Sequence, residues 1–162
     1  MDLLEVKNRV AEALVESIFR RARYTIIPVK PSTASGARAW REEFAPHLVV
    51  KKETERQVLE LPISVKYRVQ ISQYLAIEQQ RGPKSTFHMA WRQWPDLRFI
   101  FVSERPEPGR SCFQVVQPGD GRSIDLIHTT DLADQTELEI FRHNVEDHEE
   151  LVRRIFLLLS EA

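Results

Sequence analysis

One strongly alternating stretch, residues 57–69, carries the side chains with the clearest chemical potential. Its odd positions from Leu59 to Val69 are apolar, whereas its even positions include Ser64, Lys66 and Arg68. Successive side chains of a strand point to opposite faces, so the pattern predicts a strand with one apolar face and one polar row. A lysine in the middle of so apolar a strand is a candidate functional group. The alternative is an antiparallel strand whose polar face is simply solvated.

The composition is that of an ordinary soluble globular domain. The chain has 162 residues, of which 42% are hydrophobic and 29% are charged, and its formal net charge is -1. This length suffices for one domain with its own core. A protein that binds nucleic acid through a strongly basic coat is excluded, so any such binding must use a local basic patch.

The cysteine content and the hydropathy pattern indicate the cellular compartment in which the protein is expected. Cys112 is the single cysteine, so no disulfide can form within the chain, which agrees with a reducing cytoplasm. It lies in an apolar run, which favours a buried and inert thiol. No stretch approaches the roughly 18 consecutive apolar residues of a membrane-spanning helix. The acidic N-terminus does not resemble a signal peptide. We therefore expect a cytoplasmic protein with no membrane partner.

Helix and strand patterns alternate along the chain, with no linker long enough to divide it. Asp2, Ser72, Ser85 and Asn144 are the expected N-caps of four helices. The expected helices span 2–23, 37–44, 72–80, 86–93 and the C-terminal segment from 144, and the expected strands span 24–29, 46–51, 57–69, 97–102, 112–116 and 123–128. The charged turn at 52–56 predicts a hairpin. The order predicts one α/β domain over residues 1–162, with a central sheet flanked by helices.

The order of helix, strand, hairpin, Val-Lys-Tyr-Arg strand, helix and strand resembles the restriction-endonuclease-like PD-(D/E)xK nuclease superfamily. The resemblance covers roughly residues 2–103 and implies a mixed sheet between helices. It also implies a Mg²⁺ site built from an Asp at the start of one hairpin strand, an (Asp/Glu)-x-Lys on the next, and often a Glu from the first helix. Carboxylates would hold Mg²⁺, which activates water, and the Lys would stabilise charge on the phosphoryl group.

Carried over by position, the resemblance is partial. Glu12 occupies the place of the helix Glu, and Lys66 that of the strand Lys. In Ala45-Pro46-His47-Leu48, His47 replaces the Asp, and Ser64 replaces the strand acid two residues before Lys66. Two central metal ligands are therefore missing, since Mg²⁺ prefers anionic oxygen ligands. The chain resembles a degenerate member of the superfamily.

Two other carboxylates are candidates for a relocated metal ligand. Some members of the superfamily move the lost strand acid to the following helix, and Glu78 lies on the helix predicted there. Glu60 shares the predicted strand face of Ser64. The alternative for Glu78 is a solvated helix residue.

Candidate nucleic-acid contacts surround the same strand. Gln70 and Tyr74 match the Gln-x-x-x-Tyr element of the RecB-like branch of the superfamily, in which the Gln supports the site or contacts DNA. Arg68 and Lys51 are the basic residues placed to join Gln70 in contacting phosphates. The alternative is that each is an ordinary surface residue.

Three functions remain open at this stage. The first is a restriction-endonuclease-like domain with an eroded metal site, retained for binding nucleic acid or a protein partner and without a certain cofactor. The second is an active Mg²⁺-dependent nuclease with a relocated set of Glu12, Lys66 and Glu78 or Glu60, with or without His47. The third is a protein-interaction domain without nucleic-acid contact, which the near-neutral charge favours. If the resemblance holds, Glu12, His47, Ser64 and Lys66 should converge, with Lys66 on the face lined by Glu12.

Overall fold

The computed structural model describes residues 2–29, 45–116 and 127–161. The expected loop at 31–36, the expected helix at 37–44 and most of the strand expected at 123–128 lie outside these residues. The strands are β1 (Thr25–Pro28), β2 (Leu48–Glu53), β3 (Val58–Tyr67), β4 (Arg98–Val102), β5 (Phe113–Val116) and β6 (Thr130–Asp131). The helices are α1 (Leu3–Arg21), α3 (Ile71–Gln80), α4 (Thr86–Gln93) and α5 (Arg142–Glu161), with short 3-10 turns at Gly82–Lys84, Leu132–Asp134 and Thr136–Leu138.

The six strands form one mixed sheet whose spatial order follows the chain from β1 to β6. β3 pairs with β2 in an antiparallel hairpin and with β4 in parallel. The other described pairs, β1–β2, β4–β5 and β5–β6, are antiparallel. The predicted hairpin and the central position of β3 are therefore confirmed, and so is the α/β class with a mixed sheet flanked by helices.

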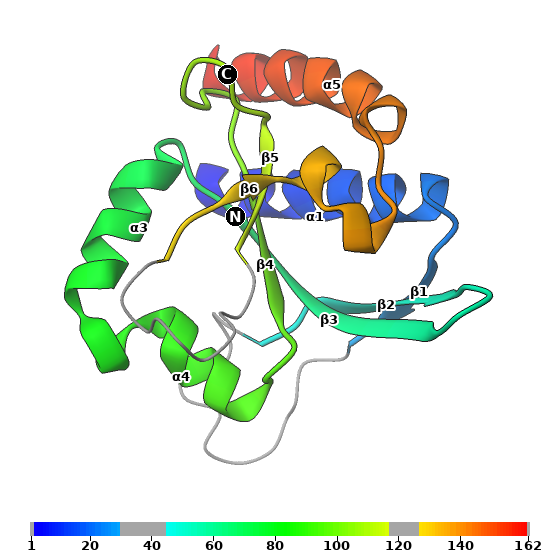
Figure 1. Cartoon of the computed structure of the whole chain (residues 1–162). Helices are drawn as coiled ribbons and strands as arrows, with labels where there is room; N and C mark the ends of the chain where they lie inside the picture. Colours follow the sequence, from blue (N-terminus) through cyan, green and yellow to red (C-terminus); the bar gives the residue numbers. More distant parts are fainter. Residues whose placement is uncertain (1, 30–44, 117–126, 162) are drawn as a thin grey trace.

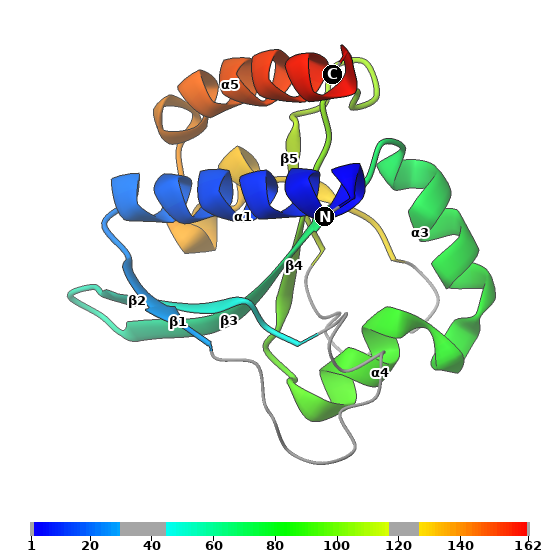
Figure 2. The same cartoon turned by 180° about the vertical axis from the view of Figure 1, so that it is seen from behind.

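Helices cover both faces of this sheet (Figures 1 and 2). α1 and α5 lie over the face that carries Ile63 and Val65 of β3, and their apolar residues form the larger core. α3 and α4 lie over the opposite face, where Phe87 packs against Phe99 and Phe101 of β4. The alternation of β3 is explained by this arrangement, because each face of the strand meets a different helical layer.

Local chemistry sets the helix ends, and two predicted starts are wrong. Asp2 caps α1, and Ser85 caps α4 by accepting the His88 N–H, as expected. α3 begins at Ile71 rather than after Ser72, whose side chain instead hydrogen-bonds Glu107. α5 begins at Arg142, two residues before Asn144.

Asn144 still takes part in the helix start, although not as the N-cap. Its Oδ1 accepts the Phe141 N–H at 2.9 Å, and its own N–H bonds the Phe141 carbonyl at 2.9 Å. The first bond is one half of a capping box, in which the side chain at the third helical position accepts the N–H of the residue before the helix, and the second is a backbone bond of the first turn. Of the strand expected at 123–128, only residues 127 and 128 are described, and they are irregular, whereas Thr130 and Asp131 pair with β5.

Candidate functional site

β3 is longer than β2 at one end of the hairpin, so within the described residues this edge of β3 has no strand partner. β2 begins at Leu48, opposite Ile63, so β3 continues beyond its antiparallel partner. Two side chains replace the missing strand: His47 Nδ1 accepts the Val65 N–H and Asn8 Oδ1 accepts the Tyr67 N–H, each at 2.9 Å. A buried N–H without an acceptor is costly, so these side chains stabilise the open edge.

His47 is a neutral imidazole whose two nitrogens both have defined roles. Because Nδ1 accepts a backbone N–H, the ring proton must be on Nε2. Nε2 lies 3.3 Å from Glu12 Oε1, so it donates toward that carboxylate. Burial lowers the pKa of His47 from 6.5 to about 4, and the charge of Lys66 acts in the same direction. At neutral pH the contact with Glu12 is therefore a hydrogen bond and not an ion pair.

Lys66 approaches this edge from the other side of the sheet. It lies opposite Phe101 of the second core, whereas Glu12 belongs to α1, over the first core. The expectation that Lys66 and Glu12 share one face is therefore wrong. The two groups still interact electrostatically: burial raises the pKa of Glu12, and Lys66 is the largest influence that lowers it. They meet around the open edge, and we call Asn8, Glu12, His47 and Lys66 the edge cluster.

Ser64 stands at the position of the missing strand acid, and it is fully buried. Its exposed fraction is 0%, and its hydroxyl has no hydrogen-bond partner within the described residues. It lies opposite Phe99, so its surroundings on that face are apolar. A buried hydroxyl without an acceptor adds no anionic ligand to the edge cluster.

The edge cluster does not fit a Mg²⁺ ion. It offers one carboxylate, Glu12, beside a neutral imidazole whose Nδ1 is used by the backbone and whose Nε2 carries a proton. Within residues 2–29, 45–116 and 127–161, no group of three or more His, Cys, Asp or Glu side chains is arranged to hold a metal. A hard divalent cation requires several anionic or carbonyl oxygens, and Lys66 adds positive charge here instead.

Glu78, the first candidate for a relocated ligand, does not join the edge cluster. Its carboxylate accepts the Thr86 N–H at 2.8 Å and the Thr86 hydroxyl at 2.9 Å, and it lies 3.5 Å from Arg81. Thr86 is the first residue of α4, so the carboxylate satisfies a free N–H at a helix start. Glu78 is 3% exposed. Its position is explained by helix capping, and the prediction of a solvated side chain is also wrong.

Glu60 and Lys51 lie on the hairpin, away from the edge cluster. They face each other across β2 and β3. Six residues of β3 separate Glu60 from Lys66, which is roughly 20 Å in an extended strand. Neither residue can therefore act with Lys66 on the same small group.

Gln70 and Arg68 lie where β3 passes into α3. Gln70 is exposed and is the N-cap residue of α3, although its side chain makes no capping bond. The Arg68 guanidinium lies 4.7 Å from the centre of the Tyr74 ring and donates to the Tyr67 carbonyl at 2.7 Å. Tyr74 therefore has a clear role as a platform for Arg68, which holds this basic group beside the exposed Gln70.

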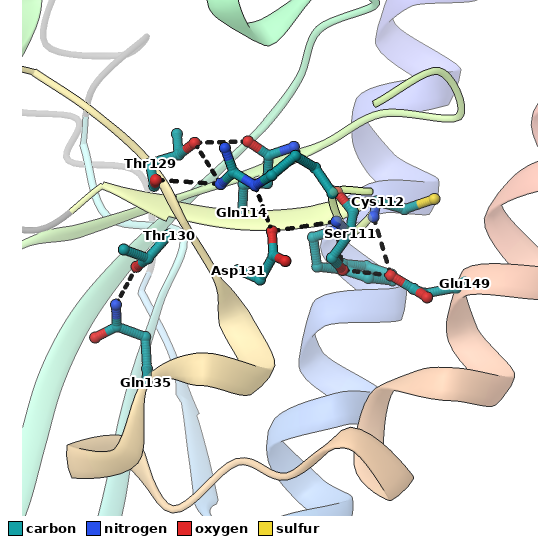
Figure 3. A network of polar contacts seen from close by, with 10 residues as sticks. Ser111, Cys112, Gln114, Thr129, Thr130, Asp131, Gln135 and Glu149 are labelled. Carbon is teal, nitrogen blue, oxygen red and sulfur yellow. Dashed lines mark hydrogen bonds and ion pairs between the residues drawn. The ribbon is translucent and has the colours of Figure 1, made fainter. Parts of the chain in front are cut away.

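A second polar network, which the sequence analysis missed, joins β5, β6 and α5 (Figure 3). Asp131 accepts the Arg110 Nε–H and the Ser111 N–H, while Glu149 accepts the Ser111 hydroxyl and the Cys112 N–H. The carboxylates thus satisfy backbone groups at the start of β5. Cys112 is buried, as predicted, and burial raises its pKa to about 11.

Asn8 is the member of the edge cluster that the sequence did not reveal. It lies one helical turn before Glu12, and that spacing places both side chains on one face of α1. This spacing was the available signal, but the need for a backbone acceptor at Tyr67 appears only once β2 is known to begin at Leu48.

Comparison of the chain with family models, curated proteins and solved structures gives no match. In the part of the chain that the structure describes, no helix combines the length and apolar character needed to cross a bilayer.

Proposed function

We propose that this chain is a restriction-endonuclease-like domain in which an internal hydrogen-bond cluster has replaced the metal site, and that its retained function is to bind nucleic acid. The element order from α1 to β4 and the electrostatic influence of Lys66 on both Glu12 and His47 support the nuclease ancestry, whereas the approach of Lys66 from the opposite face of the sheet counts against it. The proposal assigns no metal-dependent reaction to the edge cluster.

The use of both His47 nitrogens is the observation that carries this proposal. An Asp at this position offers carboxylate oxygens to a metal, whereas His47 offers Nδ1 to Val65 and a proton to Glu12. The Glu12 carboxylate thus accepts a hydrogen bond from the neutral His47 and interacts with the charge of Lys66. The groups that would bind a cation instead satisfy one another and the edge of β3.

Arg68 and Gln70 support nucleic acid as the ligand. Arg68 is held by Tyr74 and the Tyr67 carbonyl, and Gln70 is exposed beside it. An arginine and an amide at one helix start suit contacts to phosphates and sugars. Because the net charge is only -1 and few basic residues can take part, binding should be weak, and its decrease with salt should be shallow because the slope scales with the number of phosphate contacts.

Restoring the missing acids tests the loss of metal chemistry. The wild type should show neither calorimetric Mn²⁺ binding nor plasmid nicking, and His47→Asp with Ser64→Asp should bind Mn²⁺. Asp is chosen at position 64 because that site is fully buried and the shorter acid disturbs it least. His47→Asn with Ser64→Asn is the matched uncharged control. Nicking by the wild type that disappears in Lys66→Ala would overturn the proposal.

Titration of labelled single-stranded and duplex DNA at low salt tests the binding function. Arg68→Ala with Gln70→Ala should weaken binding by about tenfold, or about 1.4 kcal/mol. Arg154→Ala on the exposed face of α5 removes the same charge elsewhere and should change affinity little. Absence of binding at tens of micromolar protein, or equal losses in both variants, would contradict this function.

A protein partner is the second candidate, and exposed leucines on α5 favour it. Leu157 is 57% exposed and Leu158 is 67% exposed. Large apolar side chains in adjacent exposed positions are typical of a surface that a partner covers. Loss of a captured partner in Leu157→Glu with Leu158→Glu, with DNA affinity unchanged, would favour this candidate over nucleic-acid binding.

A further inference from the structure

A groove separate from the edge cluster runs along α3. Its described lining combines one face of the helix, where Leu75 and Ala76 lie one turn before Gln79, with the segment Ile127–Thr129. Its volume is about 330 Å³. Pockets that hold small ligands begin at about 300 Å³, so one compact group fits and a folded partner does not.

The floor of the groove is polar and rigidly held. Gln114 of β5 is 0% exposed, yet its amide faces the layer of α3 and not solvent. It donates to the Ser111 carbonyl at 3.0 Å and accepts the Thr129 hydroxyl at 2.6 Å (Figure 3). Thr129 and Gln114 are therefore held in place before any ligand binds, so binding costs little side-chain entropy at the floor of the groove.

Arg110 brings hydrogen-bond donors to one end of the groove. Its Nε bonds Asp131, and one terminal nitrogen, Nη2, bonds both Thr129 oxygens. Within the described residues Nη1 makes no hydrogen bond, so two N–H groups of a fixed planar guanidinium are left for a ligand. Asp131 offsets the arginine charge, so a neutral acceptor suits this end as well as an anion does.

We infer that this groove receives one unpaired nucleobase, an inference that rests on the nucleic-acid binding proposed above. Leu75, Ala76 and Ile127 provide an apolar wall for the flat face of a base, and Arg110 lies where its polar edge would find donors. Unpaired bases are recognised in this way, by one face against apolar or aromatic groups and by hydrogen bonds to the edge. Ser72, at the same end of α3 as Gln70, also lines the groove, so a strand held by Gln70 has a base within reach.

Titration of the labelled protein with single nucleosides, followed by NMR, tests this inference without requiring phosphate contacts. At least one nucleoside should give saturable shifts at Ala76, Gln79 and Thr129, with a dissociation constant of about 1 mM. Ala76→Leu fills the groove from an exposed helix position and should weaken this binding by about tenfold or more. Ala13→Leu, an equivalent exposed change on α1, should leave the affinity unchanged.

The result separates this inference from the proposed function. DNA binding that depends on Arg68 and Gln70, with no saturable nucleoside shifts in the groove, would overturn the base pocket alone. Nucleoside binding that Ala76→Leu does not weaken would also overturn it. Nucleoside binding lost in Ala76→Leu supports the pocket even if the DNA contacts at Arg68 fail, because a single nucleoside does not need them.

Discussion

The edge cluster and the junction of α3 with α4 each contain a candidate metal-binding glutamate, yet they use it in opposite ways. The Glu12 side chain is 34% exposed and has one neutral neighbour at 3.3 Å. The Glu78 side chain is 4% exposed, and Thr86 and Arg81 supply its donors. Placement on the expected helix therefore says little about whether a carboxylate is available. The donors that surround it decide, because a buried acid that caps a helix has no free oxygen for a ligand.

The largest expected effect is the loss of stability when the Glu78 carboxylate is removed. Glu78→Ala should lower the free energy of unfolding by about 3 kcal/mol, because two buried donors of Thr86 lose their acceptor. Urea unfolding measures this change. Glu78→Gln keeps an acceptor and should cost less.

Glu12→Ala is the matched change in the edge cluster, and it should cost less than about 1 kcal/mol because the carboxylate is partly solvated. Equal losses of unfolding free energy in the two variants would mean that Glu12 stabilises the fold as much as Glu78 does. A loss confined to binding in Glu12→Ala, and to stability in Glu78→Ala, would sharpen the distinction.

A loss of stability of intermediate size is expected as the pH is lowered, because His47 becomes protonated on unfolding. Its pKa is lowered from 6.5 to about 4, so the unfolded chain takes up the proton first as pH falls. Stability should therefore decrease between pH 6.5 and about 4. The raised pKa of Glu12 acts in the opposite direction and therefore reduces the loss of stability due to His47.

Urea unfolding at several pH values compares the wild type with His47→Asn. Asn can accept the Val65 N–H without titrating, so its stability should depend less on pH in this range. Some dependence should persist, because burial also lowers the pKa of His148. Superimposable pH profiles of the two proteins would show that His47 is not the titrating group.

A small expected effect, confined to the edge of β3, concerns Asn8. Asn8→Ala removes the acceptor for the buried Tyr67 N–H and should cost about 1 kcal/mol. Hydrogen exchange at Tyr67 should accelerate more than exchange at Val65, whose acceptor is His47. Asn8→Asp keeps an acceptor oxygen and is the control. Unchanged protection at Tyr67 in Asn8→Ala would mean that the edge does not depend on side-chain acceptors.

The sequence predicts regular elements well wherever periodicity is strong. The alternation of residues 57–69 predicts β3, and the charged turn after β2 predicts the hairpin, because both patterns are local. Helix starts are less certain, since Ser72 and Asn144 are good capping residues that other partners occupy: Glu107 for Ser72 and the N–H of Phe141 for Asn144. The N-cap preference of a single residue type does not show which hydrogen-bond partner that side chain finds in the folded chain.

The candidate site is predictable in membership but not in geometry. Residue types and order point to Glu12, His47 and Lys66, and the structure brings these three into electrostatic contact. The face of Lys66 depends on the pairing of β3 with β4, and the role of Asn8 depends on where β2 begins. That boundary results from tertiary structure and leaves no periodic signal, which is also why the capping role of Glu78 is not visible in the sequence.

The single parallel pairing among the described strands has a consequence for the order of folding. β1, β2 and β3 pair through antiparallel contacts between near neighbours, whereas β4 can join β3 only after the chain between Tyr67 and Arg98 has crossed over the sheet. Every member of the edge cluster lies before residue 68, so during synthesis its groups emerge before the crossover exists. We therefore expect the N-terminal hairpin layer to assemble first and the parallel closure to limit the folding rate, since distant contacts form slowly.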